Sequence, residues 1–364
     1  MTRYDVVIVG AGIAGASLAA ELAPHASVLL IEAEDQPGYH ATGRSAAFWS
    51  ETYGGLLIQP LTSASGPWLR EAGLLIPRGE LYLARAEDRS ALDRFCAEFE
   101  GSVELERWPA ERARRWLPNL APEWVETLWM PSCTDIDVAG AHQRFLQLAR
   151  QGSVDLRCEA PLESAERDGQ SWRLQASGQE IAAGILVNAA GAWADLVAQM
   201  AGVAPIGIQP YRRTVVQLEV DPPAPADLPL VMAMDGSFYF KPEAAGRLWL
   251  SPHDETPVDP CDAAPEELDV AIAIDRFEQA ANWPIKRVER RWAGLRSFAP
   301  DRLPVYGFDR ACPGFFWCAG QGGFGIQTAP AAARMAADLL LGRPVADVDP
   351  APYLPNRFRN GGKG

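Results

Sequence analysis

The sequence has few of the residues that bind metals or form disulfides. It holds six cysteines without a Cys-x-x-Cys pair, and four histidines without the spacing of metal ligands. Such pairs are the usual sequence signs of a zinc or redox site. We therefore expect reduced thiols and no metal.

Positive charge is also scarce. Lysine and arginine number 33 against 47 aspartates and glutamates, which gives a formal net charge of −14. Because nucleic-acid binding depends on basic side chains that neutralise phosphates, this balance argues against non-specific nucleic-acid binding. It also argues against a broadly cationic membrane-binding face, although a local basic site is compatible with it.

Long hydrophobic runs are missing as well. The apolar stretch at 6–22 is broken by glycines, so no integral membrane segment is expected. Because a strand pattern begins four residues from Met1, we expect no signal or transit peptide. The expected location is the cytoplasm, with a peripheral position at the inner face of the membrane as an alternative.

The clearest motif of the sequence lies near its start. Residues 6–9 are a branched apolar run, as expected of a strand buried in a parallel sheet, and Gly10, Gly12 and Gly15 follow it before an Ala- and Leu-rich stretch. Gly10 permits a sharp turn, Gly12 lets a pyrophosphate approach the backbone, and Gly15 lets a helix pack closely on the strand. The pattern predicts a dinucleotide-binding βαβ unit.

A second apolar run, 27–31, ends in Glu32, which is placed to accept hydrogen bonds from a ribose. The residues up to this point leave NAD and FAD both open. Next comes a turn at 35–38 and a segment of small residues that contains one cation, Arg44. This arginine could neutralise a phosphate, or it could be an exposed loop residue.

The glycine turn, Glu32 and the run Gln-Pro-Gly-Tyr-His-Ala-Thr-Gly-Arg-Ser-Ala-Ala at 36–47 resemble the FAD-dependent D-amino-acid oxidase and dehydrogenase superfamily, most closely the bacterial D-arginine dehydrogenases. The resemblance implies non-covalent FAD, lined by Thr42, Gly43, Arg44, Ser45 and Ala46. It also implies a loop at 48–54 that covers the substrate and carries Tyr53.

The resemblance runs nearly end to end and sets the expected fold, an α/β protein of two domains. A Rossmann-like FAD-binding domain is expected from residues 1–76, 134–204 and 290–364. An α+β substrate domain with a mixed or antiparallel sheet is expected from 77–133 and 205–289. A length of 364 residues with 48% hydrophobic residues suits two such domains.

Glu80 begins an expected strand in which Leu81 and Leu83 alternate with Glu80 and Tyr82. By itself, an acid at this place is usually a solvated residue. The resemblance instead places it against a substrate guanidinium. Phe48 stands where the D-arginine dehydrogenases usually have a histidine, which predicts an apolar wall beside the substrate.

Other segments carry structural expectations. We expect an amphipathic helix at 107–124 with its tryptophans in the core, a helix N-cap at Asp137, and strands of a small sheet at 153–159 and 172–176. The run 183–193 predicts a buried strand, and the resemblance places its glycine, Gly191, beneath the cofactor.

The second half of the chain carries the expected substrate residues. Arg212 and Arg213 lie on opposite faces of one expected strand, so one of them must face inward, and Tyr239 lies in a second strand. Arg296 sits among apolar residues, where a guanidinium needs a buried anion. The resemblance assigns Arg296 and Arg212 to a substrate carboxylate.

A last glycine-rich strand-to-helix turn lies at 320–327. Its glycines would allow backbone contact with a flavin ring, and a helix N-terminus would favour negative charge there. We expect Gly322 and Gly325 beside the cofactor. In the family, the residues that match Gly323 and Gln327 also contact substrate or flavin.

These residues together predict an FAD enzyme that oxidises D-amino acids to imino acids by hydride transfer from Cα. Arg212, Tyr239 and Arg296 would position the substrate, and basic or larger apolar side chains would be favoured. A quinone or other carrier would re-oxidise the flavin, with oxygen as an alternative. The alternatives are a secondary-amine or 2-hydroxy-acid oxidoreductase, a flavin-binding sensor or assembly partner, and an NAD enzyme.

Overall fold

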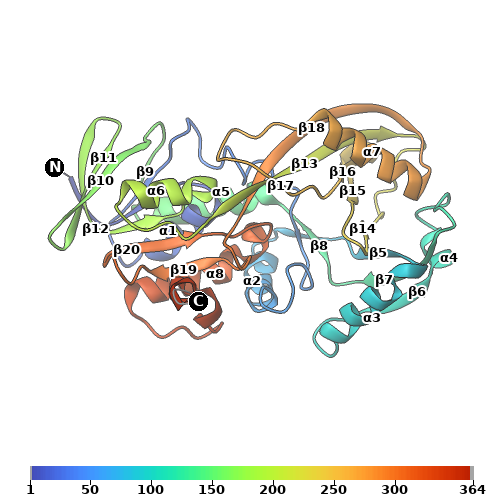
Figure 1. Ribbon diagram of the computed structural model, residues 1–364, viewed down its shortest axis with the longest axis horizontal. Coiled ribbons are helices and arrows are strands. Elements are labelled where there is room, and N and C mark those ends of the chain that lie inside the picture. The colour runs from blue at the N-terminus through green and yellow to red at the C-terminus, as the bar shows by residue number, and fades with distance from the viewer. Residues whose placement is uncertain (1, 361–364) are drawn as a thin grey trace.

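The computed structural model describes residues 2–360. Two sheets lie in two lobes, which Figure 1 shows side by side along the long axis. The predicted α/β fold, a Rossmann-like part joined to a part with a mixed sheet, is confirmed.

The first sheet has eight strands around a parallel centre, in the order β10-β11-β12-β1-β2-β9, with β20 and β19 attached through β12. These strands are β1 (Thr2–Val9), β2 (Val28–Ile31), β9 (Asp155–Arg157), β10 (Leu162–Asp168), β11 (Ser171–Ala176), β12 (Gln179–Asn188), β19 (Val305–Phe308) and β20 (Phe315–Ala319).

Helices cover both faces of this sheet, which is why Val6 to Val9 are all buried. Val6 and Ile8 face one core cluster with most of the helices, and Val7 and Val9 face the other with α6. The helices of the first face are α1 (Ile13–Leu22), α2 (Gln59–Glu71), α5 (Val138–Gln151) and α8 (Gly325–Leu341), and α6 is Ala194–Met200.

The second sheet has nine strands, in the order β17-β13-β16-β15-β14-β5-β7-β6, with β18 also paired to β13. They are β5 (Glu80–Arg85), β6 (Glu106–Pro109), β7 (Trp124–Met130), β13 (Gln209–Val220), β14 (Leu230–Ala233), β15 (Tyr239–Glu243), β16 (Arg247–Ser251), β17 (Thr256–Pro257) and β18 (Ile285–Phe298). Three further helices lie in this lobe: α3 (Arg89–Glu98), α4 (Ala110–Ala113) and α7 (Glu267–Ala281).

A small third sheet, β3-β8-β4, joins the lobes; its strands are β3 (Phe48–Trp49), β8 (Thr134–Ile136) and β4 (Leu75–Pro77). Asp137 caps α5 as predicted, since its side chain accepts a hydrogen bond from the Gly140 amide at 2.8 Å. The predicted domain boundaries stay a prediction, and β18 crosses the one at residue 290.

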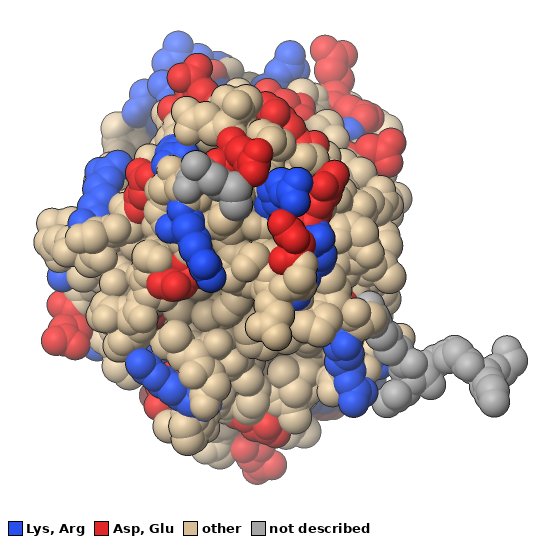
Figure 2. Space-filling view, turned by 90° about the vertical axis from the view of Figure 1, so that its left-hand side faces the viewer, with Lys and Arg blue, Asp and Glu red and all other residues tan. Residues whose placement is uncertain are grey.

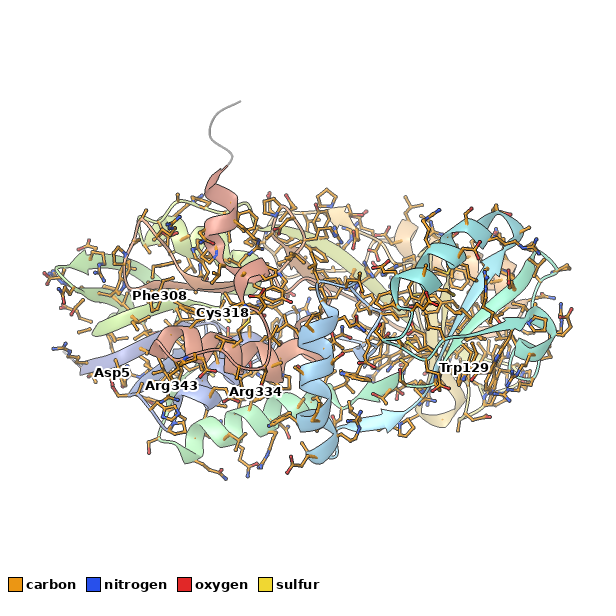
Figure 3. The ribbon with its side chains drawn as sticks, turned by 90° about the horizontal axis from the view of Figure 1, so that it is seen from below. Asp5, Trp129, Phe308, Cys318, Arg334 and Arg343 are labelled. Carbon is orange, nitrogen blue, oxygen red and sulfur yellow. The ribbon has the colours of Figure 1, made fainter. Side chains whose placement is uncertain are left out.

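Two sequence-based expectations are wrong. The segment 107–124 is β6, the single turn α4 and a loop, because its tryptophans pack against sheet and loop rather than along a helix. Trp108, Trp116 and Trp124 are nevertheless buried in the core, as expected, and their neighbour Trp129 lies in the lobe far from Asp5 (Figure 3). The strands expected at 153–159 and 172–176 are present as β9 and β11, but they form no separate sheet, because β9 pairs with β2, and β11 with β12.

The surface at the end that carries β10 and β11 is of mixed charge. In Figure 2, lysine and arginine are interspersed with aspartate and glutamate over the described residues of this face. Among residues 2–360, no helix is both long and apolar enough to span a bilayer.

Candidate active site

A continuous cavity with a volume of about 430 Å³ connects the two lobes. At one end it is lined by Gly10, Gly12 and Glu32, which belong to the first sheet and its turn. At the other end it reaches the second sheet, where the lining side chains include Phe48, Tyr53, Arg213, Tyr239 and Arg296. The chain thus brings together residues that are up to about 290 positions apart in sequence.

The glycine turn after β1 is close-packed on the protein side and open toward the cavity. Gly10 has a φ of +102°, and a Cβ on Gly15 would stand 1.9 Å from the carbonyl oxygen of Gly10. A Cβ on Gly12 would meet only the Thr42 hydroxyl, at 3.2 Å. The three glycines therefore serve the turn, the cavity wall and the close packing of α1, as the sequence indicated.

Glu32 is held in place by backbone amides. Its Oε2 accepts from the Ala11 amide at 2.9 Å, and its Oε1 accepts from the Glu34 amide at 3.2 Å. Thr42 closes the same turn, since its hydroxyl oxygen accepts from the Ile13 amide at 2.9 Å. A fixed carboxylate at the end of β2 presents its remaining lone pairs to the cavity, where ribose hydroxyls can donate to them.

Thr42 and residues 44–47 also line the cavity, but the guanidinium of Arg44 is already bonded. It pairs with Asp262 and donates to the carbonyl oxygens of Ala263 at 2.7 Å and Ala293 at 3.2 Å. Arg44 therefore ties this segment to the second lobe. Its expected role as a phosphate ligand has no support from this arrangement. Ser45 and Ala46 line the cavity as expected, whereas Gly43 does not.

Two consecutive arginines of β13 point to opposite sides. Arg212 lies outside the cavity lining, paired with Glu266 and with Asp269 at 3.0 Å. Arg213 lines the cavity; its Nε donates to the Asp254 carbonyl oxygen at 2.7 Å. The sequence-based preference for Arg212 as the substrate arginine is therefore not supported by the geometry. On β13 it is the side chain of Arg213, and not that of Arg212, that lines the cavity.

The buried Arg213 and the partly buried Arg296 form a pair of like charges. Arg213 is 4% exposed, and burial, with a contribution from the Arg296 charge, lowers the pKa of Arg213 to about 10. Arg296 donates to the Tyr53 hydroxyl. The Nη1 of Arg213 is buried without a hydrogen-bond partner among the described residues. Arg213 pairs with the Glu255 carboxylate at 3.1 Å, so its charge is partly compensated, while its free Nη1 donor favours a further acceptor.

Three aromatic rings surround these cations. Phe48 packs on Tyr53, with ring centroids 5.1 Å apart, and on Tyr239 at 6.3 Å. Gly323 backs the cation pair, since a Cβ there would come within 2.8 Å of the Tyr53 hydroxyl and 2.9 Å of the Arg296 Nη1. The site therefore places guanidinium groups beside the apolar surface of aromatic rings.

The turn at 320–327 carries the remaining expected residues. Gln327 lines the cavity and holds the loop that bears Tyr53, because its Nε2 donates to the Tyr53 carbonyl at 3.1 Å and its Oε1 accepts from the Ser50 amide at 3.3 Å. Gly191, Gly322 and Gly325 also line the cavity. At Gly322 a Cβ would stand 2.1 Å from the Phe298 ring, so only glycine fits.

Glu80 does not line the cavity. It is fully buried behind the loop, where its Oε2 accepts from the Ser50 hydroxyl at 2.8 Å and its Oε1 has no hydrogen-bond partner among the described residues. Burial raises the pKa of Glu80 to about 7, and the hydrogen bond from Ser50 opposes that shift. Its predicted contact with a substrate cation is not supported by this position.

Sequence reasoning missed His253 and Ser50. His253 packs edge-on against Tyr239, at 5.7 Å between ring centroids, and its Nδ1 bonds the Gly236 carbonyl at 2.6 Å. Burial, together with the neighbouring Arg213 and Arg296 charges, lowers the pKa of His253 to about 3, so the ring is neutral. Neither residue stands in a motif, so no sequence signal could have found them.

A model of one family, the FAD dependent oxidoreductases abbreviated DAO, matches residues 5–339. The chain therefore belongs to the FAD-dependent oxidoreductases of the DAO family, and its cofactor is FAD. The finer resemblance to D-arginine dehydrogenases stays a prediction. Among the described residues, no group of three or more His, Cys, Asp and Glu side chains could hold a metal ion.

Two curated relatives are 28% identical to the chain over the aligned residues. Glycine oxidase of Pseudomonas aeruginosa is 28% identical over 96% of the chain and 98% of that protein. FAD-dependent oxidoreductase domain-containing protein 1 of Bos taurus is 28% identical over 51% of the chain, and the match spans only 41% of that longer protein.

Solved structures share the fold. L-proline dehydrogenase from P. horikoshii superposes with a TM-score of 0.86 at 23% identity, covering 99% of both chains. Glycine oxidase from Geobacillus kaustophilus gives a TM-score of 0.85 at 23% identity, covering 97% of this chain and 98% of that one.

The residues present fit FAD. A Cβ on Gly12 would meet one side-chain oxygen and a Cβ on Gly191 would meet nothing within 4 Å, so both glycines leave the cavity open to a ligand. The carboxylate of Glu32 and the N-terminus of α1 lie at the same end, as a ribose and a pyrophosphate require. With the adenosine and pyrophosphate at that end, the flavin ring of FAD would extend toward the end lined by the aromatic rings and arginines.

We predict that Gly12→Val abolishes most FAD binding without unfolding the protein. The added side chain would enter the cavity and meet little of the protein, so the steric conflict falls on the pyrophosphate. Flavin absorbance per protein should fall while the far-ultraviolet circular dichroism of the variant stays native. Gly15→Ala is the contrast, because its Cβ meets the Gly10 carbonyl and should impair folding itself. Full FAD occupancy in Gly12→Val would contradict this placement.

We predict that Glu80 makes the protein less stable as pH rises toward neutral. The folded-state pKa of about 7 exceeds the ordinary value of 4.5, so the folded protein binds this proton more tightly than the unfolded chain. The stabilisation is complete below about pH 4.5 and is lost as pH rises through 7, up to about 3 kcal/mol. Urea midpoints of the holoenzyme at several pH values measure this loss.

Glu80→Gln should remove that dependence, because an amide does not titrate in this range. Glu87→Gln, which changes an exposed acid of the same lobe, should leave it intact. Identical pH profiles for wild type and Glu80→Gln would show that Glu80 ionises normally in the folded protein.

Proposed function

We propose that the protein oxidises the Cα–N bond of a D-amino acid with a neutral, apolar side chain to the imino acid, which water hydrolyses to the 2-oxo acid and ammonia. The observation that carries the proposal is the pair of like charges, Arg213 and Arg296, at the aromatic end of the cavity. When bound, FAD supplies the hydride acceptor.

The two arginines would bind the substrate carboxylate. The unpartnered Nη1 of Arg213 and the Arg296 guanidinium can both donate to one carboxylate, and the anion would relieve the repulsion between them. Tyr53 accepts from Arg296, so its own hydroxyl hydrogen is free to serve a second acceptor, such as a carboxylate oxygen.

Positioning would supply most of the catalysis. At this end of the cavity the ionisable lining side chains are Tyr53, Arg213, Tyr239 and Arg296, which are poor general bases near neutral pH. The amine must therefore lose its proton before hydride transfer, to solvent. A carboxylate fixed at one point and a side chain packed on Phe48 would aim the Cα hydrogen in one direction.

The position of Glu80 changes the expected side-chain preference. The resemblance favoured basic substrates through this acid, but its carboxyl lies behind Ser50 and outside the cavity lining. Phe48, Tyr53 and Tyr239 offer apolar surface, which rewards apolar side chains at about 25 cal/mol per Å² buried. We therefore favour neutral, apolar D-amino acids over D-arginine.

A second candidate is the oxidation of glycine or of a secondary amino acid. It is favoured by the match to Pseudomonas aeruginosa glycine oxidase over nearly the full length of both proteins. The carboxylate site would be the same, and only the groups around the nitrogen and Cα would differ.

A substrate panel separates the two candidates. The oxidised enzyme is mixed without oxygen with D-leucine, D-phenylalanine, D-arginine, their L-forms, glycine, N-methylglycine and L-proline, and flavin bleaching is followed. We expect the neutral D-amino acids to bleach the flavin faster than D-arginine. Faster bleaching by glycine or a secondary amino acid selects the second candidate, and bleaching by none of them excludes both.

We predict that Arg213→Met weakens catalysis far more than Arg212→Met. Removing one charge-assisted bond to a buried carboxylate should cost about 2–4 kcal/mol, or roughly 30- to 700-fold in kcat/KM. Arg212→Met disturbs ion pairs outside the cavity and should change kcat/KM less than about threefold. Flavin occupancy and the unfolding midpoint are measured for both variants. A larger loss of kcat/KM in Arg212→Met than in Arg213→Met would instead assign the substrate carboxylate to Arg212.

A further inference from the structure

One carboxylate, that of Glu255, bonds two guanidinium groups at once. Its Oε1 accepts from the Arg213 Nη2 at 3.1 Å, and both of its oxygens accept from the Arg302 Nη2, at 2.8 and 3.0 Å. Arg213 is buried and lines the cavity, whereas Arg302 lies at the surface with 48% of its side chain exposed. Glu255 does not line the cavity, and the reaction proposed above gives it no role.

Arg213 is held at two of its three nitrogens. Its Nε donates to the Asp254 carbonyl oxygen at 2.7 Å, and its Nη2 donates to Glu255. A planar guanidinium bonded at Nε and Nη2 is held in one orientation, so Glu255 helps to fix the cation that lines the cavity. The Arg302 guanidinium is held differently, because its Cζ lies 3.8 Å from the centroid of the Phe298 ring. Arg213, Glu255 and Arg302 therefore form a fixed row from the cavity to the surface.

Five charged side chains form a cluster at this place, namely Arg213, Arg296, Arg302, Asp254 and Glu255. The three guanidinium groups lie close together, because burial and then the charges of all three lower the pKa of the neighbouring His253. The Asp254 carboxylate accepts from the amide and the hydroxyl of Thr214, at 2.7 and 3.0 Å. Glu255 is the acid that bonds two of the guanidinium groups. Three cations against two acids leave one positive charge in excess, which one substrate carboxylate would balance.

Glu255 and a substrate carboxylate would share the positive charge of Arg213. Two negative charges beside one guanidinium repel each other, and a partly buried site screens that repulsion less than water does. Arg302 acts in the opposite direction, because its bonds to both Glu255 oxygens neutralise part of the Glu255 charge. The affinity of the site for a carboxylate should therefore rise when Glu255 loses its charge, and fall when Arg302 loses its charge.

We propose that Glu255 is a positioning residue that acts through Arg213 and sets how tightly the site holds a carboxylate. It fixes the orientation of the guanidinium and, as a counter-ion, limits the affinity of Arg213 for carboxylates. The 2-oxo acid product carries the same carboxylate as the substrate, so a limited affinity lets the product leave. The inference rests on the proposed function, in which Arg213 and Arg296 bind the substrate carboxylate.

The test measures the binding of benzoate, which has a carboxylate and no amine, to the oxidised holoenzyme. Benzoate is titrated in, and the change in flavin absorbance gives its Kd. Glu255→Gln keeps the length of the side chain and an oxygen that can accept from the Arg213 Nη2, but it removes the charge. We expect the Kd to fall roughly 3- to 10-fold in this variant. In Arg302→Gln the Kd should rise by a similar factor, because more of the Glu255 charge then acts on Arg213.

Glu278→Gln is the matched control, because it makes the same change of net charge at an exposed position of α7 and should leave the Kd unaltered. Flavin occupancy is measured for every variant. A Kd that rises or stays the same in Glu255→Gln would overturn the inference, since a purely structural role of Glu255 predicts weaker binding on its replacement. Arg213→Met should remove most of the binding. Unaltered binding in Arg213→Met, or no binding in the wild type, would overturn the carboxylate site itself and this inference with it.

Discussion

The site at the junction of the lobes depends on two neighbouring cations, the buried Arg213 and the partly buried Arg296. Arg213 on β13 and Arg296 on β18 meet because these antiparallel strands are in register, with Arg213 opposite Gly294 and Arg296 opposite Tyr211. Each cation has partial compensation, from Asp254 and Glu255 for Arg213 and from the Tyr53 hydroxyl for Arg296. Such a pair is unfavourable in a low dielectric unless an anion is bound. The two like charges therefore favour a further anion where the two lobes meet.

The β13 and β18 ribbon also explains why the site lies at the junction of the lobes. Both strands are long, at 12 and 14 residues, and they reach from the second sheet toward the first (Figure 1). Gly294 lies in the middle of β18. A Cβ added to Gly294 would stand 3.3 Å from the Cβ of Arg44. The ribbon therefore packs directly on the segment that carries Arg44. The Arg44 guanidinium stabilises that contact, because it donates to the carbonyl oxygens of Ala263 and Ala293.

Local sequence was enough to predict the glycine turn and the place of Glu32, because residues close together in the chain determine the strand, turn and helix there. It was not enough to choose between Arg212 and Arg213. Alternation along a strand puts the two on opposite faces, and only the packing of β13 decides which face is inward. The segment 107–124 was misread for a related reason: stacked tryptophans and Arg112 over Trp108 stabilise a non-helical path that no local periodicity describes.

Glu80 shows that the strand position of an acid does not determine what surrounds its carboxyl. Its strand position was predicted correctly, with Leu81 and Leu83 in one core cluster and Tyr82 in the other. What the sequence could not show is that Glu80 is fully buried, bonded to Ser50 and outside the cavity lining. A carboxyl that is fully buried without a cation nearby is stable mainly in its neutral form, and as a neutral acid it can donate as well as accept. It bonds the Ser50 hydroxyl, and the loop that Ser50 belongs to carries Tyr53, which accepts from Arg296.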